Sequence, residues 1–154
     1  MDYTIEGIDP GRFAPLFSAS SEELSRLNAR IMFADNDSYP CRVSLTEATR
    51  GDTLLLVNYQ HQPAASPYRS AHAIFVARGS QIRGTFRNEI PPIIRARTLS
   101  IRAFDTNHLI VAADIVEGSQ CESLIRQLLD RSDTAYLHVH FAKRGCFAAT
   151  ARRI

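Results

Sequence analysis

The last twenty residues, Ala135–Ile154, read AYLHVHFAKRGCFAATARRI and decide the type of fold. Through TAYLHVHF, apolar and polar side chains alternate, and a period of two sends alternate side chains to opposite faces of a β-strand. His138 and His140 therefore share one face. The residues AKRG at positions 142–145 interrupt the alternation before CFAATA begins at Cys146. The pattern predicts an antiparallel hairpin with both histidines on the same face.

The hairpin can close in two registers, and these place Cys146 on different faces. With a four-residue loop, Phe141 pairs with Cys146 and the sulfur lies on the apolar face. With a five-residue loop, His140 pairs with Cys146, because a slip of one residue moves every side chain to the opposite face. The second register also turns Phe147 rather than Thr150 to the core, and burying the aromatic side chain contributes roughly 1.5–3 kcal/mol. We therefore expect Cys146 on the histidine face.

Upstream of this hairpin the chain contains mostly strands and two helices. The turn residues Thr106 and Asn107 predict another hairpin. Both helices are expected to start with a capping box, in which a serine and a glutamate three residues later satisfy free backbone N–H groups. The predicted strands are RIMFAD at 30–35, TLLLVNY at 53–59, AHAIFVA at 71–77, RTLSIRAFD at 97–105 and HLIVAADIV at 108–116. The predicted helices are Ser20–Asn28, with the pair Ser20 and Glu23, and Ser119–Arg131, with the pair Ser119 and Glu122.

Strands joined by short hairpins, with few helices, are typical of the α+β class. We expect one compact domain over residues 1–154, built on a mainly antiparallel sheet with two principal helices. Cys121 falls on the apolar stripe of the second helix, which indicates a structural role in the core.

Composition excludes several classes of protein. The net charge of +2 and the scattered arginines give no basic block, so no nucleic-acid partner is expected. No apolar stretch approaches the ~20 residues of a spanning helix, and the first residues lack the pattern of a signal peptide. Three cysteines, an odd and sparse set, fit free thiols in a reducing compartment. We expect a cytoplasmic protein with no membrane contact, and leave the oligomeric state open.

Adjacent same-face histidines can bind a metal, line a polar groove or simply face solvent. A zinc site needs at least a third ligand. The candidates are His61, Cys41 and Cys146, and none has a local ligand spacing, so no metal and no cofactor is predicted. A polar wall of a pocket is favoured because Tyr59 and His61 share a face at the end of the buried run TLLLVNY.

Several arginines and a tyrosine in neighbouring segments extend this pocket hypothesis. Arginine presents a planar fork of donors suited to carboxylate or phosphate. Each arginine alone is better explained as a solvated surface cation, and only the set as a whole favours a pocket. The leading hypothesis is a pocket that binds, and can transform, a small anionic metabolite. Its candidate catalytic residues are His138, His140 and Cys146, and its candidate ligand-binding residues are Arg42, Tyr59, His61, Tyr68, Arg69 and Arg102.

Two other functions remain open. Cys146 or Cys41 could act as a nucleophile activated by a histidine and an arginine. Alternatively, the domain binds a protein partner without catalysis, in which case the polar side chains scatter and an apolar patch is exposed elsewhere. Whether the protein is an enzyme is left undecided.

Five motifs together resemble a bacterial family known only as domain of unknown function 1203: YPCRVSL, LLLVNYQHQ, SPYRSAHAIFV, LSIRAFD and YLHVHFAKRGCFAA. The resemblance runs from about Phe13 to the C-terminus and implies a compact single domain, with no known activity, ligand or cofactor. It adds weight to the family's recurring polar positions, which here are Cys41, Arg42, Tyr59, His61, Pro67, Tyr68, Arg69, Arg102, Asp105, His138, His140 and Cys146. Phe141 departs from the asparagine that the family tends to have after the second histidine.

Overall fold

Three antiparallel sheets form the framework of the computed structural model, which describes residues 1–154. The largest has six strands in the order β7-β1-β11-β10-β8-β9, the next has the order β2-β5-β6, and β3 pairs with β4. The strands are β1 Tyr3–Glu6, β2 Ala29–Phe33, β3 Tyr39–Pro40, β4 Glu47–Ala48, β5 Thr53–Gln62, β6 Ser70–Ala77, β7 Thr85–Arg87, β8 Thr98–Phe104, β9 Ile110–Glu117, β10 Tyr136–Phe141 and β11 Phe147–Arg153.

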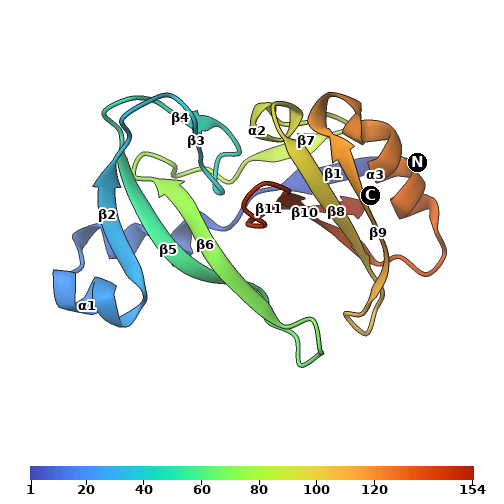
Figure 1. The fold of residues 1–154 in the computed structure, drawn as a ribbon, viewed down its shortest axis with the longest axis horizontal. Coiled ribbons are helices and arrows are strands. Elements are labelled where there is room, and N and C mark those ends of the chain that lie inside the picture. Colours follow the sequence, from blue (N-terminus) through green and yellow to red (C-terminus); the bar gives the residue numbers. More distant parts are fainter.

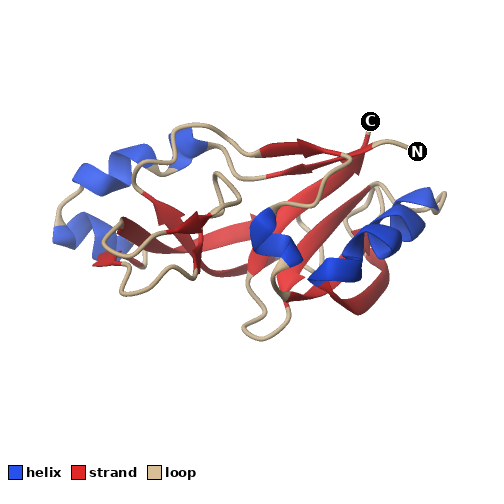
Figure 2. Ribbon diagram, turned by 90° about the horizontal axis from the view of Figure 1, so that it is seen from above, coloured by secondary structure: helices blue, strands red, loops and turns tan.

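Helices are short, and Figure 2 shows them at both ends of the molecule and near its middle. The α-helices are α1 Ser21–Arg26, α2 Pro92–Arg95 and α3 Cys121–Asp130, and the 3-10 helices are η1 Pro10–Arg12, η2 Ala14–Ser18 and η3 Gly118–Gln120. None of the helices combines the length and the apolar character needed to cross a lipid bilayer. The α+β class, the antiparallel pairing and the two principal helices are confirmed.

One of the two predicted capping boxes is present. Ser20 Oγ accepts from the N–H of Glu23, and the Glu23 carboxylate accepts from the N–H of Ser20, so α1 starts as its sequence predicts. The second box does not form. The chain at Ser119 belongs to η3, Gln120 is the N-cap of α3 without a side-chain hydrogen bond, and Glu122 binds Arg126 one turn along.

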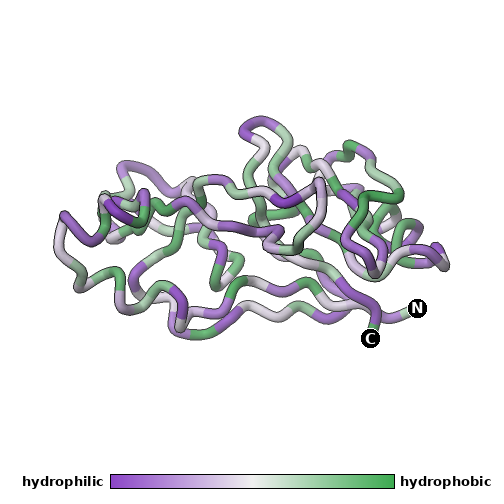
Figure 3. The backbone as a smooth tube through the Cα atoms, turned by 90° about the horizontal axis from the view of Figure 1, so that it is seen from below, coloured by the Kyte–Doolittle hydropathy of each residue, from purple (hydrophilic) through white to green (hydrophobic).

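The six-stranded sheet carries its apolar core on the side of α3. Twenty buried residues join this sheet to α2 and α3, among them Cys121, Leu137 and Val139, so the structural role of Cys121 is confirmed. A second cluster of ten buried residues lies around β5, β6 and the N-terminal helices and includes Phe147 of β11. Hydrophobic stretches accordingly occur in both halves of the molecule in Figure 3.

The loop between β3 and β4 connects the two halves. Cys41 forms a parallel bridge with Phe75 of β6, while the carbonyl of Arg42 accepts from the N–H of Ile8 and the carbonyl of Val43 from that of Gly84. In Figure 1 this loop lies between the half with β2, β5 and β6 and the half with β8–β11. The end of β5 and the histidine face of β10 thereby come together.

Candidate functional site

Three histidines from two sheets form one buried cluster. His138 and His140 lie on β10, a central strand between β8 and β11, and His61 lies at the end of β5. Their ring centroids are 4.9 Å apart for His61 and His140, 6.0 Å for His61 and His138, and 6.1 Å for His138 and His140. Each is at least nine-tenths buried. The predicted shared face of His138 and His140 is confirmed, and it is covered by protein rather than by solvent.

Aromatic side chains surround this cluster. The Phe147 ring lies parallel to the His61 ring, with centroids 5.5 Å apart, and it meets the edges of the other two imidazoles. Phe104 of β8 packs against His138 at 4.9 Å. The imidazoles are therefore held in a largely apolar surrounding of aromatic rings.

Burial keeps all three imidazoles neutral at pH 7. It lowers the pKa of His61 to about 4, with a further contribution from the positive charge of Arg102. It lowers the pKa of His138 to about 3, reinforced by the neighbouring imidazoles of His140 and His61. The pKa of His140 is also lowered to about 3, mainly by burial. Neutral imidazole is the form that accepts a hydrogen bond or a proton.

Each imidazole of the cluster has one buried nitrogen without a partner. His140 Nδ1 lies 2.9 Å from the carbonyl oxygen of Gly145 and must be its N–H donor, which leaves Nε2 as a free acceptor. His61 Nε2 hydrogen-bonds with Ser70 Oγ at 3.0 Å. The unpartnered atoms are His61 Nδ1, His138 Nδ1 and His140 Nε2. Buried polar atoms are rarely left unsatisfied, so these nitrogens call for a ligand group or water.

A cavity of about 240 Å³ opens beside His61 and His140 and contains two arginines. Arg69 comes from the loop before β6, and Arg102 from β8, directly opposite His138 in the β8–β10 register. Neither arginine takes part in any of the five ion pairs of the structure. The rest of the wall consists of Pro67, Tyr68, Ser70, Phe104 and Ile110. The structure thus brings together His61, His140, Tyr68, Arg69 and Arg102 from the predicted set.

Two predicted site residues lie near the cavity but not in its wall. His138 is behind His61 and His140, in contact with both rings. Tyr59 packs against Phe13 and Phe147, with Arg12 over its ring.

The expectation that Cys146 shares the histidine face is wrong. The N–H of Phe141 donates to the carbonyl of Cys146, and Gly145, at φ +77°, closes a four-residue turn onto Phe141. The sulfur therefore belongs to the apolar cluster that contains Leu137 and Val139.

The physical reason is a β-bulge that a simple alternation does not predict. Val139 pairs with Ala149 while His140 pairs with Phe147, so Ala148 is an additional residue. Because of this bulge, Phe147 and Thr150 both fall on the histidine side. On that side Phe147 is buried against β5. The argument that only one register buries Phe147 therefore did not hold.

Arg42 is also separated from the histidine cavity. Its guanidinium is buried, and Nε donates to the carbonyl of Phe147 while Nη2 donates to the sulfur of Cys146 at 3.0 Å. Arg42 and Cys146 line a different cavity, of about 720 Å³, whose wall contains no histidine. The expectation that Arg42, His61, Arg69, His138 and His140 surround one cavity therefore holds for His61, Arg69 and His140, and it is wrong for Arg42.

Cys41 has no imidazole partner either. Its sulfur accepts from the N–H of Ala77 and lies 3.1 Å from Ser80 Oγ. Burial raises the pKa of the Cys41 thiol, but hydrogen bonds from Ala77, Ser80 and Ser44 outweigh burial and the net pKa is lowered. The structure holds no group of three His, Cys, Asp or Glu side chains with the geometry of a metal site.

Sequence reasoning missed several residues of the cavity. Ser70 follows directly after Arg69, and Phe104 lies two positions after Arg102 on the same strand face, so both could have been added from sequence alone. Phe147, which packs on His61 outside the cavity wall, could not have been added, because the face on which it lies depends on the bulge.

Comparisons with known proteins identify the family. The model of a family described as "Protein of unknown function (DUF1203)" matches residues 38–153, three quarters of the chain, and the chain belongs to this family. The suspected resemblance is confirmed. Neither a curated protein nor a solved structure matches the chain.

Proposed function

We propose that the histidine cavity binds a small anionic molecule that also carries an O–H or N–H donor. The observation that carries this proposal is the pairing, in one cavity, of two arginines without carboxylate partners and a buried neutral imidazole with a free acceptor nitrogen. The arginines attract the anionic group. His140 Nε2 accepts a hydrogen bond from the O–H or N–H group of the ligand.

Charge and geometry support this assignment of roles. Arg102 is half-buried, and burial lowers its pKa below that of an ordinary arginine, yet an arginine remains protonated at pH 7. Arg69 is exposed at the mouth of the cavity. An anion bound between the two arginines would exchange its hydrating water for contacts with two positive charges. The neutral imidazole of His140 adds no charge of its own.

We infer a second role for His140, the transfer of a proton. Its Nδ1–H is held by the carbonyl of Gly145, which keeps the lone pair on Nε2. A positioned imidazole with its other nitrogen oriented is the usual arrangement of a histidine that acts as a base. Because burial lowers the pKa of His140 to about 3, the neutral imidazole is a weak base, which takes a proton only from an acidic group and returns it readily.

The arrangement argues against the two other functions. A scattered decoration of a sheet would not gather His61, His140, Arg69 and Arg102 around one cavity. Cys–His thiol chemistry lacks its hydrogen bond, because the polar partners of Cys146 and Cys41 are Arg42, Ser80 and Ala77.

Phosphate and sulfate form a matched pair of probes for this proposal. Both are tetrahedral anions, but at pH 7 only phosphate carries an O–H. We expect isothermal titration calorimetry to show phosphate binding about ten-fold more tightly than sulfate, since a hydrogen bond to a charged group contributes roughly 1.5–3 kcal/mol. Equal affinities for the two anions would refute the role of His140 Nε2.

Variants locate the binding. Arg102→Gln should weaken both anions, whereas His140→Phe should remove only the preference for phosphate. Arg30→Gln is the control, because Arg30 is exposed on β2 and takes part in no ion pair. If Arg102→Gln binds phosphate as the unchanged protein does, the ligand lies elsewhere and the proposal fails.

A further inference from the structure

A second cavity, of about 720 Å³, lies on the other side of β11 from the histidines. It is bounded by the β3–β4 hairpin, the end of α2 and the turn between β10 and β11. Phe147 separates the two cavities, because its ring stacks on His61 while its carbonyl accepts from Arg42. Nothing in the function proposed above uses this second cavity.

The buried cation at this cavity has no counter-ion. Arg42 is 1% exposed, and none of the five ion pairs includes it. Its acceptors are the carbonyls of Pro40 and Phe147 and the sulfur of Cys146, and its guanidinium lies 4.8 Å from the ring centroid of Phe141. Burial lowers the pKa of Arg42 to about 10, so it remains charged at pH 7. A buried charge without a counter-ion is costly, and such charges are commonly found at functional sites.

Cys146 Sγ is the one side-chain acceptor of Arg42, at 3.0 Å. Cys146 also lines the cavity. Arg42 is therefore a positioning residue that orients the sulfur beside the cavity.

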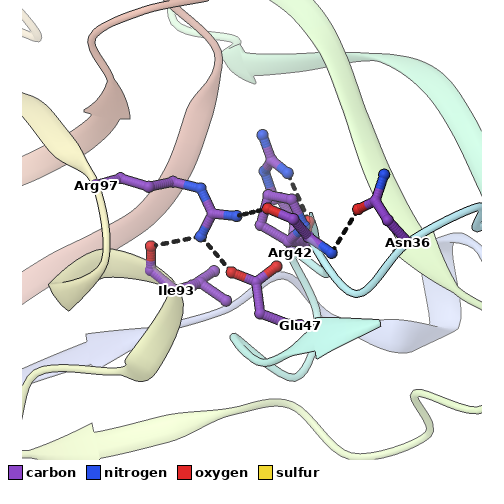
Figure 4. A network of polar contacts seen from close by, with 7 residues as sticks. Asn36, Arg42, Glu47, Ile93 and Arg97 are labelled. Carbon is purple, nitrogen blue, oxygen red and sulfur yellow. Dashed lines mark hydrogen bonds and ion pairs between the residues drawn. The ribbon is translucent and has the colours of Figure 1, made fainter. Parts of the chain in front are cut away.

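The rim of the cavity carries an excess of positive charge. Arg97 is paired with Glu47 and also contacts the carbonyl of Ile93, as Figure 4 shows beside Arg42. Lys143 and Arg144, in the β10–β11 turn, are exposed and unpaired. Glu117 is the other carboxylate of the wall and accepts from Thr98. The cavity wall therefore contains four positively charged side chains, counting Arg42, and two carboxylates.

We propose that this cavity is a second site, which admits small carboxylates with an electrophilic carbon and presents Cys146 to them as the nucleophile. The basic rim attracts the carboxylate, and Arg42 holds the sulfur. In the reaction, a carbon–sulfur bond forms while the bond from that carbon to its leaving group breaks. The leaving group departs with the electron pair, and the thiol proton passes to water.

Iodoacetate and iodoacetamide test this site, because they share the reactive carbon and differ in charge. Alkylation displaces iodide from either reagent and is followed at each cysteine by mass spectrometry of peptides. The ratio of the iodoacetate rate to the iodoacetamide rate at Cys146 should exceed the same ratio for free cysteine by about ten-fold, because a basic cleft concentrates anions. Cys41 is an internal reference, since the wall of its own cavity contains two carboxylates, Glu47 and Asp52, against one cation, Arg78, and should not favour iodoacetate.

The double variant Lys143→Gln/Arg144→Gln changes only exposed turn residues and should lower the ratio at Cys146 several-fold, while Arg30→Gln leaves it unchanged. High salt should reduce the ratio in the same direction. A ratio at Cys146 equal to that of free cysteine, or no alkylation of Cys146 by either reagent in the folded protein, overturns the proposal. Neither result bears on phosphate binding in the histidine cavity.

Discussion

Acid should destabilise this protein more steeply than its few histidines would suggest. His61, His138 and His140 have pKa values of about 4, 3 and 3 in the folded protein, against 6.5 for an ordinary imidazole. Below pH 6.5 the unfolded chain binds protons that the folded chain does not. Stability is therefore complete above pH 6.5 and is lost as the pH falls toward the folded pKa values.

The size of the effect follows from linkage. Between pH 6.5 and pH 5, each neutral buried histidine lowers the free energy of unfolding by roughly 1.5 kcal/mol, so three lower it by roughly 4–5 kcal/mol. This is comparable with the whole stability of an ordinary domain. Most carboxylates titrate below this window, so they contribute little to the slope.

Urea unfolding at several pH values between 7.5 and 5 measures this loss, and its slope gives the number of protons taken up on unfolding. We expect between two and three protons near pH 5.5. His138→Phe should remove about one of them, while Arg30→Gln leaves the number unchanged. A total loss below roughly 1.5 kcal/mol, the value for one histidine, would refute the buried neutral cluster.

Two further substitutions test the packing that places the cavities. Phe147→Ala should cost about 3–5 kcal/mol of stability by urea unfolding, because it leaves a void among the histidines, whereas Phe33→Ala, at a side chain 68% exposed, should cost far less; similar losses would contradict the burial described. Gly118→Ala would place a Cβ 2.1 Å from the carbonyl oxygen of Ile94 and should cost roughly 1–3 kcal/mol or more, while Gly79→Ala meets nothing within 4 Å. Equal melting temperatures for the two glycine variants would show that η3 can move away from α2.

The class of fold was predictable from the sequence because it depends on local patterns. Alternation in β10, the turns at Thr106 and at residues 142–145, and the capping box at Ser20 each involve neighbouring residues. The second capping box failed because η3, ahead of α3, takes up Ser119, and that extension depends on how Gly118 packs against α2.

The histidine cavity was predicted in part, since same-face spacing and clustered arginines are visible in one sequence. The position of Cys146 was not, because one additional residue in β11 changes which side chains share a face. Arg42 was misplaced for a related reason. Its loop crosses between the two halves of the molecule, and no local pattern shows on which side of β11 a long side chain ends.

The charge and tautomer of His140 test the proposed function most directly. A long-range proton–nitrogen NMR spectrum of the imidazole nitrogens at pH 7, recorded with and without phosphate, reports both. We predict that His140 is neutral, with its proton on Nδ1, and that phosphate shifts the Nε2 resonance while sulfate leaves it nearly unchanged. A charged His140, a proton on Nε2, or an Nε2 resonance indifferent to phosphate would contradict the assignment of this cavity as an anion site with His140 as acceptor.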